Sequence, residues 1–315
     1  MNPQTFYPTK DPAKVIIDTD PGVDDAIAIL MALAAPSLDV IGMTTVGGNV
    51  PLARTTRNAL ALLEYAGRSG VPVARGSPRP IRGRYQYASV VHGKSGLSRK
   101  LPNPKTEPIK AAAVDFLATR LRDSPGQITL VALGPLTNLA RLLTRHPDAL
   151  RLAAALVVMG GAVDVPGNVT SHAEFNFYSD PEAASLILSS GIPLTLVDLA
   201  ACHQVAINRE EAGRLKARNR LGALAVQLMA NWFRRDGSRQ RFEFYDPLAL
   251  AVALDPEIIT TRSVTLTVET ANPARLGATR VTAEGGPIAL AQRVDRRGFF
   301  DLLEELLGLE FGLSH

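Results

Sequence analysis

The chain has 315 residues, of which 46% are hydrophobic and 20% are charged, a composition typical of a soluble globular protein with a large core. Its net charge is only +4 and aromatic residues make up 5%, which argues against a nucleic-acid-binding protein. The single cysteine, Cys202, excludes an internal disulfide, and no apolar run reaches the roughly 18 residues that cross a membrane. The opening residues lack the pattern of a signal peptide, so we expect a cytoplasmic protein.

Short apolar runs typical of buried strands alternate with helical patterns along much of the chain. The predicted strands lie at residues 14–18, 39–46, 128–133, 154–160 and 193–199. The predicted helices between them lie at residues 24–35, 51–67, 135–147 and 180–190. This alternation predicts an α/β fold with an open, mostly parallel sheet flanked by helices. In such sheets, ligands bind at the edge where the strands end.

The later part of the chain is less regular. Residues 192–246 are more helical and more polar, and residues 210–235 predict one or two amphipathic helices. A strand is predicted over 263–270 and a helix over 301–309. No repeat or linker divides the chain, so we expect a flexible N-terminal arm over residues 1–13 and a single α/β domain over 14–315.

Four aspartates stand where the first predicted strand meets the first predicted helix, in the stretch VIIDTDPGVDDAIAIL. Asp24 or Asp25 alone would be an ordinary residue for a helix start, because the helix dipole favours negative charge there. That explanation does not extend to Asp18 and Asp20 as well, since carboxylates this close together repel each other. A divalent cation removes the repulsion. Aspartate oxygens suit Ca²⁺ or Mg²⁺, and the absence of a Cys/His cluster argues against zinc.

The motif DTDPGVDDAIAI resembles the N-terminal signature of the nucleoside hydrolases of the inosine-uridine-preferring type. The resemblance continues in the order of that family through TTVGGN, VHGKSGL, LGPLTNLA, VVMGG, GNVTSHAEFNFYSDPEAA and YDPLALA. Together these motifs cover most of the chain between Lys14 and Glu257. The ordered set is far more specific than any one of its members.

The resemblance implies an open α/β sheet with a helical segment near the active site, and hydrolysis of the N-glycosidic bond of ribonucleosides to ribose and free base. It implies one Ca²⁺ held by Asp20, Asp25, Asp246 and the carbonyl oxygen of Leu133. A water bound to that ion would be deprotonated by Asp20 as general base. The family habit further implies a homodimer or homotetramer that takes a small-molecule ribonucleoside.

The ribose hydroxyls are expected to meet polar residues, with Asp24 on the 2′-hydroxyl. The full implied substrate set is Asp24, Asn49, Met159 (through its backbone), Asn168, Glu174 and Asn176. A site built to bond hydroxyls rejects sugars that lack them, so we expect poor activity on 2′-deoxynucleosides. Asp18 is expected to orient the loop rather than to touch the substrate.

Protonation of the leaving base is where the sequence departs from the family. His92 matches a family histidine beside the base, but Tyr245 stands where many members carry a second histidine before the metal aspartate. Tyrosine is a weaker acid, with a reference pKa of about 10. Activation of the base is therefore expected from Tyr245, from His92, or from the stretch near Gln227 and Trp232. The choice between purines and pyrimidines stays open.

Two other functions compete with this one. A non-catalytic nucleoside or ribose binder would keep the pocket and lose turnover through the change at Tyr245. A haloacid-dehalogenase-like phosphatase would use Asp18 as nucleophile, but Gly22 stands where that family prefers Thr or Val, and Asp24 and Asp25 would have no role.

Overall fold

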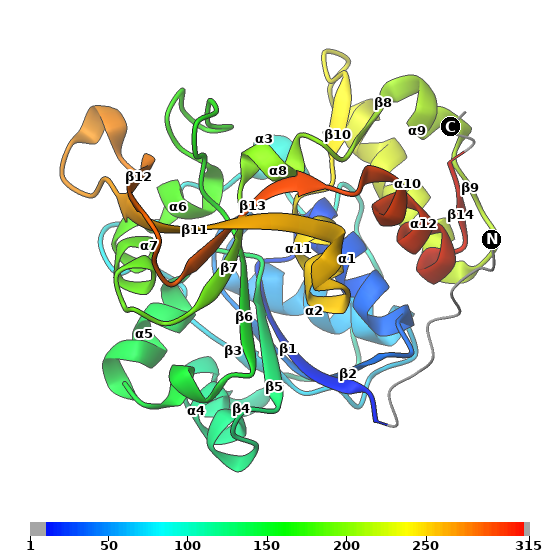
Figure 1. Cartoon of the computed structure of the whole chain (residues 1–315). Helices are drawn as coiled ribbons and strands as arrows, with labels where there is room; N and C mark the ends of the chain where they lie inside the picture. Colours follow the sequence, from blue (N-terminus) through cyan, green and yellow to red (C-terminus); the bar gives the residue numbers. More distant parts are fainter. Residues whose placement is uncertain (1–10, 312–315) are drawn as a thin grey trace, which may run out of the picture.

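The computed structural model describes residues 11–311, and its main feature is a ten-stranded sheet with helices on both faces (Figure 1). The strand order is β12-β11-β13-β7-β6-β5-β1-β2-β3-β4. The strands are β1 Ala13–Thr19, β2 Leu38–Thr45, β3 Val73–Arg75, β4 Ile109–Ala112, β5 Ile128–Ala132, β6 Ala155–Met159, β7 Leu194–Val197, β11 Ile259–Val268, β12 Thr279–Glu284 and β13 Ile288–Val294. Most of the predicted N-terminal arm lies outside the described residues, and β1 already begins at Ala13.

All pairings from β13 to β4 are parallel, whereas β11 runs antiparallel to both β13 and β12. The predicted fold class, an open and mostly parallel sheet flanked by helices, is thus confirmed. Central strands read as continuous apolar runs because both of their faces are covered, and Val15, Ile16 and Ile17 of β1 are all fully buried.

The described part of the chain contains twelve α-helices. They are α1 Val23–Ala34, α2 Leu52–Tyr65, α3 Ser89–His92, α4 Ala113–Asp123, α5 Thr137–Arg145, α6 Phe175–Ser179, α7 Pro181–Leu188, α8 Leu199–Cys202, α9 Arg209–Arg214, α10 Arg220–Arg235, α11 Tyr245–Leu254 and α12 Arg296–Leu307. One apolar core joins α1, α2, α10, α11 and α12 to one face of the sheet, and a second joins α4, α5 and α7 to the other. No helix among residues 11–311 is long and apolar enough to cross a membrane.

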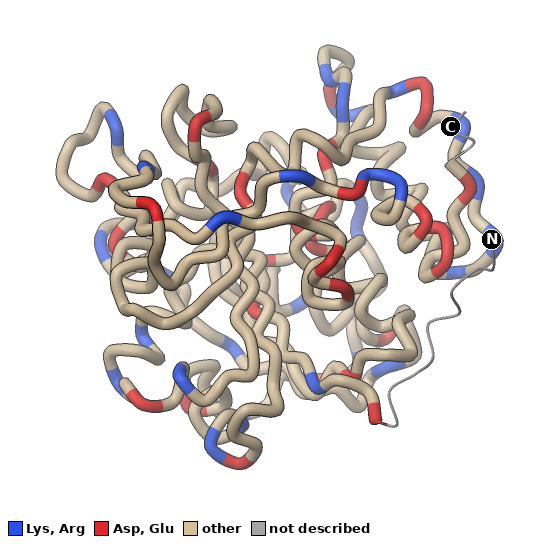
Figure 2. Tube along the Cα trace, viewed as in Figure 1, with Lys and Arg blue, Asp and Glu red and all other residues tan. Residues whose placement is uncertain are grey.

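Smaller elements complete the chain. Two short ribbons pair β8 (Ala206–Asn208) with β10 (Arg241–Glu243), and β9 (Lys216–Ala217) with β14 (Leu309–Glu310). Single 3₁₀ turns occur at Ala149–Leu152, Pro256–Ile258 and Pro273–Arg275. Basic and acidic residues are interspersed over the trace in Figure 2, in keeping with the small net charge.

The parallel register brings the ends of the central strands together. Thr19 at the end of β1 pairs with Thr45 at the end of β2, and Asp18 pairs with Ala132 at the end of β5. The segments that follow these strands carry the DTDPG, VGGN and LGP motifs, which therefore meet at one edge of the sheet.

Candidate active site

The turn between β1 and α1 is shaped around the aspartate cluster. Gly22 precedes the first residue of α1, and its N–H donates a hydrogen bond to Asp25 Oδ2 at 2.9 Å. A Cβ atom at Gly22 would stand 2.7 Å from Asn49 Nδ2 and 2.8 Å from His92 Nδ1, so a larger residue would displace both. The glycine of DTDPG is thus required by the close approach of two site residues.

Both carboxylate oxygens of Asp25 accept hydrogen bonds from neighbouring residues. Its Oδ1 accepts from the Thr19 hydroxyl at 2.5 Å and from the Asp20 N–H at 3.3 Å, and its Oδ2 also accepts from Asn49 Nδ2 at 3.1 Å. The residue caps the helix, as an acid at a helix start should. It also lines the pocket, so capping and site roles are combined in one side chain.

Asp20 is held with one oxygen bonded and the other free. Oδ2 accepts from the Asn49 N–H at 2.5 Å, while the buried Oδ1 has no hydrogen-bond partner among the described residues. A Cβ at Gly48 or Gly134 would overlap the Asp20 carboxylate, so two glycine backbones enclose it. Burial, with the charge of Asp25 second, raises the pKa of Asp20 well above its usual range.

Three carboxylates form the group best placed for a cation. One oxygen from each of Asp24, Asp25 and Asp246 lies within 4.8 Å of the others. Asp246 comes from the first turn of α11, which packs against α1. Burial and the neighbouring Asp25 and Asp24 raise the pKa of Asp246 well above its usual range, and burial raises that of Asp24 to about 6.

These residues fit a hard cation. All the donors are carboxylate oxygens, and Asp24 Oδ1, like Asp20 Oδ1, is buried with no hydrogen-bond partner in residues 11–311. The predicted ligand set was Asp20, Asp25, Asp246 and the Leu133 carbonyl oxygen. Among its carboxylates the grouping differs in one member, with Asp24 in the place of Asp20. Asp20 nevertheless lies close enough for its charge to raise the pKa of Asp246.

The opposite wall is built by Asn176 and Glu174 around the ends of β5 and β6. Asn176 Nδ2 donates to the carbonyl oxygens of Leu133 at 2.8 Å and of Met159 at 3.3 Å. Glu174 is the N-cap of α6, and its carboxylate accepts from three backbone N–H groups, those of Asn176, Phe177 and Gly161. Burial raises the pKa of Glu174 to about 7 in spite of these bonds.

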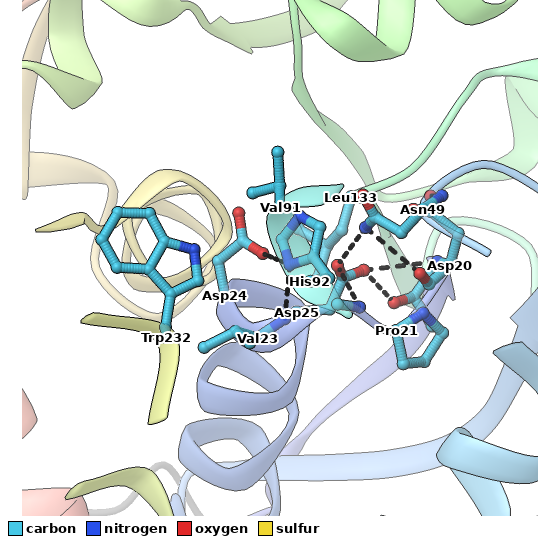
Figure 3. Close-up of polar contacts among 12 residues, drawn as sticks. Asp20, Pro21, Val23, Asp24, Asp25, Asn49, Val91, His92, Leu133 and Trp232 are labelled. Carbon is cyan, nitrogen blue, oxygen red and sulfur yellow. Dashed lines mark hydrogen bonds and ion pairs between the residues drawn. The ribbon is translucent and has the colours of Figure 1, made fainter. Parts of the chain in front are cut away.

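His92 faces the cluster from α3. Its Nδ1 accepts from the Val23 N–H at 3.1 Å and lies 3.9 Å from Asp24 Oδ1 (Figure 3). Because Nδ1 is the acceptor, a neutral ring carries its proton on Nε2. Burial lowers the pKa of His92 to about 4, against the opposing attraction of Asp25. The residue is therefore a neutral hydrogen-bond donor near pH 7.

Tyr245 is the first residue of α11 and half-buried, and its hydroxyl donates to Glu243 Oε2 at 3.4 Å. Burial raises its pKa above the usual value, so it too is neutral and donates without ionising. Trp232, on α10, lies on the far side of Asp24 from the rest of the cluster in Figure 3.

A pocket of about 210 Å³ joins these groups. Among the predicted site residues, those that line it are Asp24, Asp25, Asn49, His92, Leu133, Met159, Asn168, Glu174, Asn176, Tyr245 and Asp246. Asn168 lies at the exposed rim, where its Oδ1 accepts from the Phe175 N–H at 2.9 Å. Asp20 is the predicted residue that does not line the pocket, because it sits beneath Gly48 and Asn49.

Sequence reasoning missed much of the apolar side of this pocket. Ala88, Val91, Val169, Phe175, Phe242 and Glu243 also line it. Apart from Glu243 these are apolar residues, and their sequence pattern cannot be told from that of core or rim positions. Beneath the site, Asp18 Oδ1 accepts from Thr44 Oγ1 at 2.5 Å and Asn138 Nδ2 at 2.7 Å, and Asp18 does not line the pocket.

Known proteins share both this sequence and this fold. A sequence model of the inosine-uridine preferring nucleoside hydrolases matches residues 15–301. The pyrimidine-specific ribonucleoside hydrolase RihA of Citrobacter koseri is 40% identical over 304 residues, covering 93% of this chain and 97% of its own. The structure of a plant nucleoside hydrolase, PpNRh1, superposes with a TM-score of 0.87 at 36% identity, over 94% of this chain and 99% of its own. A purine-preferring ribonucleoside hydrolase from Gardnerella vaginalis gives a TM-score of 0.84 at 28% identity, over 92% and 96% of the two chains.

The chain belongs to the inosine-uridine preferring nucleoside hydrolase family. It is accordingly a ribonucleoside hydrolase, an N-glycosidase that acts on small-molecule ribonucleosides. The resemblance drawn from the ordered motifs is confirmed.

Proposed function

We propose that the protein hydrolyses ribonucleosides to ribose and free base with the help of one Ca²⁺ held at the aspartate cluster. The observation that carries the proposal is the pair of buried, unpaired carboxylate oxygens, Asp20 Oδ1 and Asp24 Oδ1, beside a pocket lined by three further buried carboxylates. Asp25 and Asp246 would hold the ion together with Asp20 and the Leu133 carbonyl oxygen, and Asp24 is close enough to share in it. A cation bound there supplies positive charge that orients the ribose diol and eases ionisation of a water molecule.

Side chains of the protein are proposed to accept the proton of the water and to stabilise the transition state. Asp20 is the proposed general base, because its free Oδ1 can take a proton from the attacking water while Asn49 fixes the other oxygen. The bond to the base breaks through a sugar with oxocarbenium character, and buried carboxylates on the ribose side favour that developing positive charge.

Ribose is proposed to lie among the polar residues, with Asp24 on the 2′-hydroxyl. Asn49, Asn168, Asn176, Glu174 and the Met159 backbone would meet the other hydroxyls. Glu174 Oε2 already accepts from the N–H groups of Gly161 and Phe177, and Oε1 accepts from that of Asn176, so only Oε1 keeps a lone pair for a hydroxyl.

The base is proposed to lie toward His92, Tyr245 and Trp232, on the apolar side of the pocket. His92 and Tyr245 are both neutral donors, because burial lowers the pKa of the first and raises that of the second. They would therefore activate the leaving base by donating hydrogen bonds to it, for which the Tyr245 hydroxyl would turn away from Glu243 Oε2. The final proton of the base would come from solvent.

The test is a comparison of ribose release from inosine, adenosine, uridine and cytidine, each with added Ca²⁺ and with excess chelator. Calcium-dependent release of ribose supports the proposal, and the ratio among the four substrates gives the base preference. Binding heat without ribose release would instead favour the non-catalytic binder.

Three further expectations stay proposals. A homodimer or homotetramer follows from the resemblance alone, and light scattering of the purified protein tests it. A cytoplasmic location is supported by a single buried cysteine, Cys202. The single domain over residues 14–315 is supported by one continuous ten-stranded sheet.

A further inference from the structure

Arg239 makes a double contact with the pocket residue Trp232. It lies in the turn between α10 and β10, and its side chain is only 10% exposed. The guanidinium stacks on the Trp232 ring, 4.2 Å from the ring centroid, and Nη1 donates to the Trp232 carbonyl oxygen at 2.7 Å. One side chain thus contacts both the ring and the backbone of that tryptophan.

The other arm of the same guanidinium reaches α3, the helix that carries His92. Nη2 donates to the carbonyl oxygens of Val90 at 3.2 Å and Val91 at 3.1 Å. These carbonyls belong to the last turn of a four-residue helix, where acceptors lack helical N–H partners and a cation is favourable. Arg239 therefore fixes the end of the helix at the residue before His92.

His92 is the one buried residue of α3. Val90 is 85% exposed and Val91 39% exposed, so the apolar side chains of this helix do not anchor it. Polar contacts must do so instead. Besides those of Arg239, they include the Val23 N–H on His92 Nδ1 and the Ser98 N–H on the His92 carbonyl oxygen at 2.8 Å. The segment that follows is held by Asn58 Nδ2 on the Ser95 carbonyl oxygen at 2.8 Å and by a hydrogen bond between the side chains of Arg99 and Gln227.

Arg239 is itself held by a second arginine. Arg209 donates to the Arg239 carbonyl oxygen from Nε at 3.2 Å and from Nη2 at 2.8 Å, and to the Phe233 carbonyl oxygen at 3.2 Å. Asp236 lies 3.6 Å from Arg239 Nε. These contacts hold the turn in place without substrate, so the Arg239 guanidinium is already oriented toward Trp232 and α3.

We propose that Arg239 is a positioning residue for ribonucleoside hydrolysis, which holds His92 on α3 and Trp232 on α10 at a set separation across the pocket. Both of those residues line the pocket, whereas Arg239 does not, so it acts through them. The inference rests on the proposed placement of the base beside His92 and Trp232. Its geometry needs a planar, forked donor, which lysine cannot replace.

The test compares R239M and R239K with a matched control, R220M. Arg220 also stacks at 4.2 Å from a ring centroid, that of Tyr65, but neither residue lines the pocket. We expect R239M to lower kcat/KM by on the order of ten- to hundredfold, because small misplacements of reacting groups carry such costs. In R239K, less than half of the loss in log kcat/KM should be recovered. The kcat/KM of R220M should stay within about twofold of wild type.

Trp232 is the only tryptophan, so its fluorescence reports on this site without any substrate. R239M should shift the emission to the red and increase quenching by acrylamide, whereas R220M should change neither. Full kcat/KM in R239M, or a lower melting temperature with unchanged kcat/KM per folded molecule, would overturn the proposal.

A double-mutant cycle separates this proposal from the proposed role of His92. If Arg239 acts through His92, the R239M loss should shrink to about twofold or less in an H92A background. Fully additive losses would overturn the coupling to His92. If H92A alone leaves turnover unchanged, the role of His92 fails, and Arg239 is then judged by the Trp232 signal and the kcat/KM of R239M.

Discussion

The backbone N–H of Asn49 donates to Asp20 Oδ2 at 2.5 Å, and its side-chain amide donates to the Asp20 carbonyl oxygen at 3.2 Å. Two bonds from one residue thus fix both the backbone and the carboxylate of Asp20. The remaining carboxylate oxygen is buried and has no partner among residues 11–311. This arrangement leaves one oriented oxygen for the reaction, which is what a general base needs.

Replacing Asp20 by Asn should remove that base while keeping the size and most hydrogen-bonding geometry of the side chain. We expect kcat to fall by about 10³-fold, in the range typical of general-base loss, while affinity for free ribose falls much less. Steady-state kinetics and calorimetric titration of ribose measure the two quantities. Equal losses in both would show that Asp20 serves binding rather than proton transfer.

Sugars without a 2′-hydroxyl should be poor substrates. Asp24 Oδ1 is buried and unpaired, so a 2′-deoxynucleoside would leave it without the partner that a ribonucleoside provides. We expect a preference for ribo- over deoxyribonucleosides on the order of 10⁴ in kcat/KM. The D24A variant should lose most of that preference, while the exposed-site variant D39A should keep it. An unchanged preference in D24A would assign the 2′-hydroxyl to another residue.

Glu174 should make the metal-free protein less stable as pH rises. Burial raises its pKa from 4.5 to about 7, so the folded state binds this proton more tightly than the unfolded state. The resulting stability is fully present below pH 4.5 and is lost as pH rises through 7, by up to about 3 kcal/mol.

Urea denaturation in chelator between pH 5 and 8 measures this contribution. E174Q should show a shallower fall in the free energy of unfolding than wild type, whatever its absolute stability. The exposed variant E257Q should keep the wild-type slope. Parallel curves for E174Q and wild type would contradict the assignment.

His92 should contribute to kcat only when the leaving group departs poorly as an anion. We expect H92A to lower kcat on natural ribonucleosides by roughly 10²-fold, because it removes a hydrogen-bond donor from the base. On 4-nitrophenyl riboside, whose leaving group departs readily as an anion, the loss should stay within about threefold. Similar losses on both substrates would place His92 in a role on the ribose side or in the fold.

Much of the fold could be predicted because its central strands are buried on both faces. The five predicted strands and the four early helices are all present. The one or two helices predicted over residues 210–235 are α9 and α10, which span Arg209–Arg214 and Arg220–Arg235. The predicted strand over 263–270 is also present as β11, but its antiparallel direction was not expected. The strands β3, β4, β12 and β13 and the helix α4 were not predicted; these strands are short or partly exposed and lack a long continuous apolar run.

The polar residues of the site could be predicted because they stand within the ordered motifs. The structure brings eleven of the twelve predicted residues to the pocket wall. The rest depends on tertiary contacts that no pattern reveals. Asp24 replaces Asp20 in the three-carboxylate group, and Arg239 reaches α3 from a turn about 150 residues away in sequence.

The most direct measurement of the central claim is a calcium titration of chelator-treated protein, followed by ribose release and by calorimetry in parallel. We predict that activity is lost in excess chelator, returns with one Ca²⁺ per chain, and fails to return in D246N, which lacks one of the three clustered carboxylates. Full turnover of ribonucleosides in excess chelator, with no heat of calcium binding, would contradict it.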